Sequence, residues 1–191
     1  MSEFNEENLK KNSLKDFFLN NKKIIIYSFI SLITVVIIYL GYGFYDEKKN
    51  TKLGNLYNQA NILLSNKKNE EALRLYEEVI LEKNKFYSPL SLNSIIENDL
   101  KNDEEILQLF DQVINIRSLS KEDKNLIILK KGIFLTKKGN EDQILDTLNP
   151  IINEKSIWSD LAVKTLRDFY FFKGEKNKSA QYEEILLKRN N

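Results

Sequence analysis

The stretch EEALRLYEEVI, at residues 70–80, is repeated as EEILQLFDQVI at residues 104–114. Six of the eleven positions are identical, and Tyr76 in the first copy is matched by Phe110 in the second. Apolar residues recur in both copies at spacings of three and four, which is the period of an amphipathic α-helix. An internal repeat with an offset of 34 residues indicates an array of helical units.

Two weaker copies continue this repeat along the chain, DQILDTLNPII at residues 142–152 and KNKSAQYEEIL at residues 176–186. A second amphipathic segment precedes each copy. Three of these segments have a small residue at the same place, Ala60, Ser94 or Gly132, whereas the fourth has Leu166. Two antiparallel helices in about 34 residues, with a small residue where they cross, are typical of a tetratricopeptide (TPR) unit.

We therefore predict an all-α fold in which about four TPR-like helix pairs form an α-solenoid. Pro is confined to positions 89 and 150, and no hairpin signal of the Asn-Gly or Asp-Gly kind occurs. The predicted pairs are 52–66 with 69–83, 87–100 with 103–116, 121–138 with 141–153, and 156–173 with 175–189.

Upstream of the repeats, residues 24–45 (IIIYSFISLITVVIIYLGYGFY) contain no charged residue. As a helix these residues would span about 33 Å, enough for a hydrocarbon core of about 30 Å. The segment is longer than the apolar part of a signal peptide and does not end in the small residues of a cleavage site. We therefore predict a short tail at 1–23, an uncleaved transmembrane anchor at 24–45 and a repeat domain at 46–191.

Lysines near the anchor predict its orientation. Five lysines lie in residues 1–23, and three follow the anchor at Lys48, Lys49 and Lys52. Because positive charge is retained on the cytoplasmic side, we expect a cytoplasmic N-terminus and a repeat domain on the other side of the membrane. With no Pro between residues 24 and 87, one helix is expected from about residue 24 to about residue 65. In the tail, Leu14, Phe17 and Phe18 fit either an interfacial helix or a solvated stub.

Composition argues against several classes of function. The chain has no Cys and no His, which removes structural zinc sites of the usual kind, thiolate nucleophiles and His-dependent triads. Lys and Arg number 29 against 28 for Asp and Glu, so no net field attracts nucleic acid. We expect no enzyme activity, cofactor, metal or small-molecule substrate. A carboxylate-based hydrolase is the enzymatic alternative, but the acidic clusters at 70–71, 103–105 and 141–142 are interpreted as openings of second helices, where acids suit the helix dipole.

The expected partners are proteins. In a solenoid of helix pairs the first helices line the concave surface, which commonly holds peptides or partner helices. Taking the small residues as register, we predict that this surface includes Tyr57, Asn61, Asn98, Ile133 and Lys137. The aromatic run at residues 169–172 is too wide for one buried helix face, so one or two of its rings should be exposed, and an exposed pair would form a partner patch.

A short charged N-terminal stretch (EENLKKNSLKDFFLNNKK), one anchor and degenerate TPR-like pairs together resemble the YfgM-like ancillary subunits of the SecYEG translocon. Residues 149–186, with Trp158 opening a helix and Gly174 closing one, look like the C-terminal part of alphaproteobacterial members. The resemblance implies a bacterial inner-membrane protein whose periplasmic helical domain works beside the translocon and periplasmic chaperones. The alternatives are a structural or division-linked envelope scaffold, and an organelle-type TPR receptor with the opposite orientation.

Overall fold

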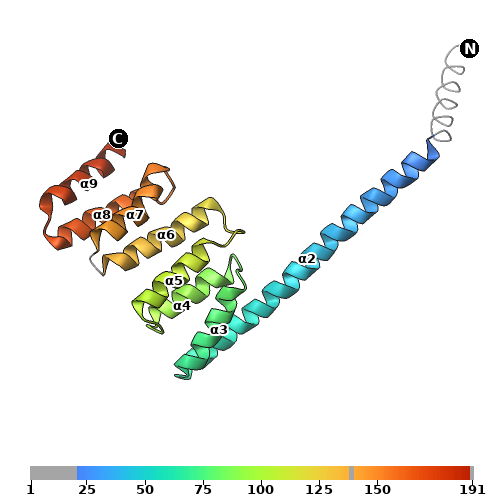
Figure 1. Ribbon diagram of the computed structural model, residues 1–191, viewed down its shortest axis with the longest axis horizontal. Helices are drawn as coiled ribbons and strands as arrows, with labels where there is room; N and C mark the ends of the chain where they lie inside the picture. Colours follow the sequence, from blue (N-terminus) through green and yellow to red (C-terminus); the bar gives the residue numbers. More distant parts are fainter. Residues whose placement is uncertain (1–20, 138–139, 190–191) are drawn as a thin grey trace, which may run out of the picture. The chain divides into compact units, whose positions relative to one another are not determined.

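The structure, a computed structural model, describes residues 21–137 and 140–189, and within them it consists of α-helices and contains no strand (Figure 1). The predicted all-α class is therefore confirmed. The helices are α2 (Lys22–Ser65), α3 (Asn69–Leu81), α4 (Tyr87–Glu97), α5 (Asp103–Ile114), α6 (Lys121–Thr136), α7 (Glu141–Asn153), α8 (Ser159–Lys173) and α9 (Lys176–Arg189).

Where a predicted helix end has a counterpart in the structure, the two positions differ by at most three residues. The largest differences are at α4, which ends at Glu97, and at α8, which begins at Ser159. The end of α4 has a local cause, because Asp99 adopts a left-handed backbone conformation, with φ of 49°. Such residues commonly terminate a helix. Three more stops of this kind, Lys67, Lys83 and Lys155, follow α2, α3 and α7.

The chain divides into two compact units, residues 1–51 and 52–191. In the first unit the structure describes the early part of α2, whose large apolar side chains are exposed, as at Phe29 and Tyr39. Among the described residues, α2 is the helix that is long and apolar enough to cross a membrane. The prediction of one helix from about residue 24 to about residue 65 is confirmed by its bounds. The prediction for Leu14, Phe17 and Phe18 lies outside the described residues.

The second unit has two clusters of buried side chains. The first contains Tyr76 and Phe110, which are 0% and 1% exposed, so these repeat positions are core positions as predicted. The second contains Leu148, at the place in the third copy that corresponds to Phe110, together with Tyr170. Helix α6 contributes to both clusters. Its residues Ile127 and Phe134 belong to the first, and Leu129 and Leu135 belong to the second.

The small residues of the repeat are buried where helices meet. Ala60 is fully buried, and the Oγ atom of Ser94 lies 3.2 Å from the hydroxyl oxygen of Tyr57. Leu166, where the small-residue pattern fails, is also fully buried. The second unit therefore accepts a larger side chain in its last pair.

The acidic clusters of the sequence open helices, as interpreted above. Asp103, Glu104 and Glu105 form the first turn of α5, and the side chain of Asn102 accepts a hydrogen bond from the backbone N–H of Glu105 at 3.0 Å. Glu70 and Glu71 lie in the first turn of α3, and Glu141 and Asp142 lie in that of α7. Acids at these positions interact favourably with the positive end of the helix dipole.

Candidate interaction groove

Three hollows follow one another across α4, α6 and α8, the first helices of the second, third and fourth predicted pairs. The first, of about 220 Å³, lies between the early turns of α4 and α6. The second, of about 240 Å³, lies between their later turns and shares Asn93, Phe110 and Lys130 with the first. The third, of about 580 Å³, lies between α6 and α8 and shares Ile133 with the second. We call this row of hollows the groove.

The wall of the groove is apolar and partly open to solvent. Ile133 is 42% exposed, Leu161 is 47% exposed and Phe172 is 86% exposed. The rings of Phe169 and Phe110 also line the groove, and both residues are largely buried. Exposed apolar side chains in a hollow offer area that a partner can remove from water, which is the main source of binding free energy at protein interfaces.

Positive charge predominates along the same wall. Lys130 donates a hydrogen bond to the side-chain oxygen of Asn93 at 3.1 Å, while Lys137 and Lys164 are exposed. None of these three lysines forms an ion pair with a residue that the structure describes. The wall contains three acids. Asp168 accepts hydrogen bonds from Arg167 and Asp123 accepts them from Ser120, whereas Glu97 lies exposed at the end of α4. The groove therefore combines apolar surface with three ammonium groups that form no ion pair within the described part of the chain.

The structure brings together two of the five residues that the sequence predicted for a partner surface. Ile133 joins the second and third hollows, and Lys137 lines the second. Asn98, which follows α4, is exposed and donates from its side chain to the backbone oxygen of Ser94 at 2.9 Å. Asn98 does not line any of the three hollows, and its role in partner binding stays a prediction.

The other two predicted residues, Tyr57 and Asn61, are half-buried in the first pair. The Tyr76 hydroxyl donates to the side-chain oxygen of Asn61 at 2.6 Å, and the ring of Tyr57 lies 5.8 Å from that of Tyr76. Burial raises the pKa of Tyr76, so its hydroxyl stays protonated and donates this bond over the whole physiological range. Both residues therefore support the packing of α2 against α3, and their predicted partner role remains a prediction.

The aromatic run at residues 169–172 divides as its length predicts. Phe169 and Tyr170 are buried, whereas Phe171 and Phe172 are 63% and 86% exposed. Phe172 faces the third hollow, and Phe171 lies beside α9 with Arg167 and Ala180. The two exposed rings therefore lie on different surfaces, Phe172 in the groove and Phe171 beside α9.

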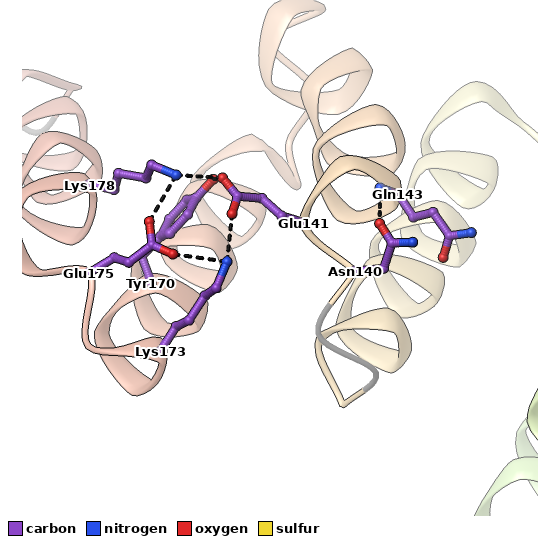
Figure 2. A network of polar contacts seen from close by, with 7 residues as sticks. All are labelled: Asn140, Glu141, Gln143, Tyr170, Lys173, Glu175 and Lys178. Carbon is purple, nitrogen blue, oxygen red and sulfur yellow. Dashed lines mark hydrogen bonds and ion pairs between the residues drawn. The ribbon is translucent and has the colours of Figure 1, made fainter.

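A carboxylate at the start of α7 holds the last helix pair in place (Figure 2). Glu141 accepts a hydrogen bond from the Tyr170 hydroxyl at 2.9 Å and ion pairs with Lys173 at 2.7 Å and Lys178 at 2.6 Å. Glu175 pairs with the same two lysines at 2.9 Å and 2.8 Å. We call these five residues the clasp, since they join α7, α8 and α9.

The electrostatics of the clasp follow from these contacts. Hydrogen bonds from Lys173, Lys178 and Tyr170 lower the pKa of Glu141 to about 2. Burial, with the hydrogen bond to Glu141, raises the pKa of Tyr170. The clasp residues therefore keep fixed charges near neutral pH and act as structural ties. From the sequence, Glu141 is interpreted only as a helix opener, because its partners lie 29 to 37 residues away.

A second tie that sequence reasoning missed holds the loop before α8. The carboxylate of Glu122 accepts hydrogen bonds from the Ser156 hydroxyl and from the backbone N–H of Ile157. The indole N–H of Trp158 donates to the backbone oxygen of Glu122 at 2.9 Å. Within residues 21–137 and 140–189, no three acidic side chains come close enough together to hold a metal ion. Glu122 is thus engaged with neighbouring donors.

The chain matches none of the protein-family models, curated proteins or solved structures with which it was compared.

Proposed function

We propose that the chain is a membrane-anchored, non-catalytic interaction module, in which TPR-like helix pairs present the groove to a segment of another protein. The observation that carries this proposal is the continuity of the groove. Three adjoining hollows on α4, α6 and α8 share lining residues, and exposed apolar side chains line them. Continuous open hollows across successive repeats are where solenoid proteins bind extended or helical segments.

The chemistry of the groove also favours one kind of segment. Lys130, Lys137 and Lys164 have no carboxylate partner among the described residues, whereas the wall between them is apolar. A segment that alternates large apolar side chains with Asp or Glu would fit this groove. Its apolar side chains would be buried against Ile133 and Phe172, and its carboxylates would pair with the lysines. Complementary charge of this kind contributes to specificity and to the rate of association.

Anchorage and orientation complete the proposal. The apolar part of α2 is long enough to span a bilayer, and five lysines before it against three after it favour a cytoplasmic tail. With this orientation the groove acts on the periplasmic side of a bacterial inner membrane. The resemblance to ancillary translocon subunits suggests the SecYEG translocon and periplasmic chaperones as partners. An envelope scaffold, or an organelle-type receptor with the opposite orientation, would use the same groove for other proteins.

Site-specific photocrosslinking in intact cells tests the groove. A photoreactive amino acid is placed at Ile133, and a matched control is placed at Gln108, which is exposed on α5 away from the groove lining. We expect discrete adducts from position 133 that are absent from position 108 and are lost in a Lys130→Glu/Lys137→Glu background. Equal adducts from both positions would contradict the groove assignment. Identification of the adducts then separates translocon components from scaffold partners.

A further inference from the structure

We propose that the loops that follow α3, α5 and α7 form a lipid-binding edge that rests on an anionic membrane surface. These loops are residues 82–86, 115–120 and 154–158, and we call them the loop edge. Each connects the second helix of one predicted pair to the first helix of the next, and all three lie along one side of the array of α3 to α9 (Figure 1). An ion pair of 2.8 Å between Lys121 and Glu154 ties the third loop to the start of α6, beside the second.

Large apolar side chains are exposed along the loop edge. Phe86 is 62% exposed and Ile157 is 74% exposed, and Leu81, the last residue of α3, is 69% exposed. Two of the loops have related sequences, EKNKFY at 82–87 and EKSIW at 154–158. In both, a lysine precedes an exposed apolar residue, which is followed by a half-buried aromatic residue, Tyr87 or Trp158. Aromatic and apolar side chains next to lysines are typical of the boundary between headgroups and acyl chains.

The unpaired charge at the loop edge is positive. Lys83, Lys85, Arg117 and Lys155 form no ion pair with any residue that the structure describes. The acids there are engaged, since Glu154 pairs with Lys121, Glu122 accepts from Ser156, and Glu82 also has an interaction partner. Basic groups close to a bilayer are attracted by anionic headgroups. The loop edge therefore combines the two contributions that bind a protein surface to such a bilayer.

The chain itself brings this edge near a membrane. Gly54, close to the start of the second unit, lies against Tyr87, since a Cβ atom at Gly54 would be 2.6 Å from the Tyr87 hydroxyl oxygen. The second unit thus begins at the loop edge. Only residues 46–51 separate this unit from the apolar segment, and six residues span at most about 20 Å. This step rests on the membrane anchorage of the proposed function.

The single tryptophan of the chain makes the inference testable, because Trp158 lies in the third loop of the edge. The full chain is reconstituted into vesicles of phosphatidylcholine and phosphatidylglycerol, with lipids that are either unlabelled or brominated on the acyl chains. Bromine quenches tryptophan only at short range. We expect about a twofold loss of Trp158 emission in brominated vesicles, as for a side chain at the interface.

Two double variants, each of which replaces two exposed apolar side chains with Ser, separate contact of the loop edge with lipid from general proximity to the membrane. Phe86→Ser/Ile157→Ser removes two exposed apolar side chains from the loop edge and should abolish most of the bromine-dependent loss. Phe171→Ser/Phe172→Ser removes two that lie outside the loop edge and should leave the loss unchanged. Helical circular dichroism confirms that each variant is folded. A loss that the first pair leaves unaltered, or that the second pair also removes, would overturn the proposal.

Charge and anchorage are tested in the same vesicles. Lys85→Gln/Arg117→Gln should reduce the quenching, and so should omission of phosphatidylglycerol, whereas equal quenching with and without this lipid would overturn the anionic preference. Flotation of the vesicles distinguishes a failure of the membrane anchorage from a failure of the lipid contact at the loop edge. If the chain does not float with lipid, the anchorage in the proposed function is wrong. If the chain floats and Trp158 is not quenched, the anchorage stands and only the loop-edge inference is wrong. The same result is expected if the loop edge binds a protein and not lipid.

Discussion

Gly132 of α6 lies so close to Leu148 of α7 that a Cβ atom at position 132 would be 2.3 Å from a methyl carbon of Leu148. Leu148 is fully buried in the second hydrophobic cluster, so it has little room to move aside. The third helix pair therefore depends on the absence of a side chain at this crossing. The same place is occupied by Ala60 in the first pair and by Ser94 in the second.

We expect Gly132→Ala to destabilise the second unit even though alanine favours a helix. Overpacking of a core costs about 1 to 3 kcal/mol, whereas the gain in helix propensity is about 1 kcal/mol. A net loss of about 1 kcal/mol should appear in urea denaturation of the full chain in detergent.

Leu148→Ala provides the matched control for this prediction. It removes the methyl groups that a Cβ at position 132 would meet. The double variant should therefore be more stable than the sum of the single effects predicts. Strict additivity of the two substitutions would contradict the assigned contact.

The clasp predicts a dependence of stability on pH. The pKa of Glu141 is lowered from 4.5 to about 2 in the folded chain by Lys173, Lys178 and Tyr170. A lowered folded-state pKa means that the ionised form stabilises the fold at pH values above about 4.5 and that this contribution is lost as the pH falls toward 2. We expect the difference in unfolding free energy between wild type and Glu141→Gln to decrease across this window.

Asp142→Asn is the matched control, because Asp142 is the exposed neighbour of Glu141 and takes no part in the clasp. Its substitution should change the pH profile of unfolding much less. If the two variants gave the same profile, the pH dependence would not come from the clasp.

The aromatic residues of the repeat should dominate core stability. Tyr76→Ala or Phe110→Ala should cost about 3 to 5 kcal/mol, a large fraction of the 5 to 15 kcal/mol that stabilises a typical domain. Tyr76→Phe keeps the ring and removes the hydroxyl that donates to Asn61, which should cost about 1 kcal/mol. Thermal unfolding monitored by circular dichroism measures all three.

Phe172→Ala is the control for these core substitutions, since its ring is 86% exposed. It should leave the melting temperature nearly unchanged. A core variant that melted like this control would contradict the packing described for the first cluster.

The orientation of the anchor is tested by reporters fused after Asn191. Because five lysines precede the apolar segment and three follow it, we expect an active alkaline phosphatase fusion and a dark fusion of a fluorescent protein that matures only in the cytosol. A bright fluorescent fusion with inactive phosphatase would reverse the assigned orientation and favour the receptor alternative.

Much of the fold could be predicted because its signals are local or periodic. The repeat of residues 70–80 at 104–114 placed Tyr76 and Phe110 in the core, and the charge-free segment at 24–45 indicated the apolar part of α2. Helix ends were less predictable. The stop at Asp99 depends on a left-handed backbone conformation at a residue other than glycine, for which the sequence carries little signal.

The groove could be predicted only in part. The small residues gave a register for α6 that selected Ile133 and Lys137, and both residues line the hollows. The register fails at Leu166 in α8, so Leu161 and Phe172 were not assigned to the groove. The clasp was missed for a different reason, since it joins side chains from three helices and depends on tertiary packing that no spacing in the sequence encodes.

Helix α6 places alternate residues in two hydrophobic clusters, Ile127 and Phe134 in one and Leu129 and Leu135 in the other. The two halves of the array are therefore held together largely by α6, and Leu107 of α5 also packs against both clusters. When an array of this kind is pulled from its ends, resistance depends on nearest-neighbour interfaces, so α6 is where the load passes from one half to the other. A ligand that lay across Ile133 would bridge α4, α6 and α8 and would make the halves yield together.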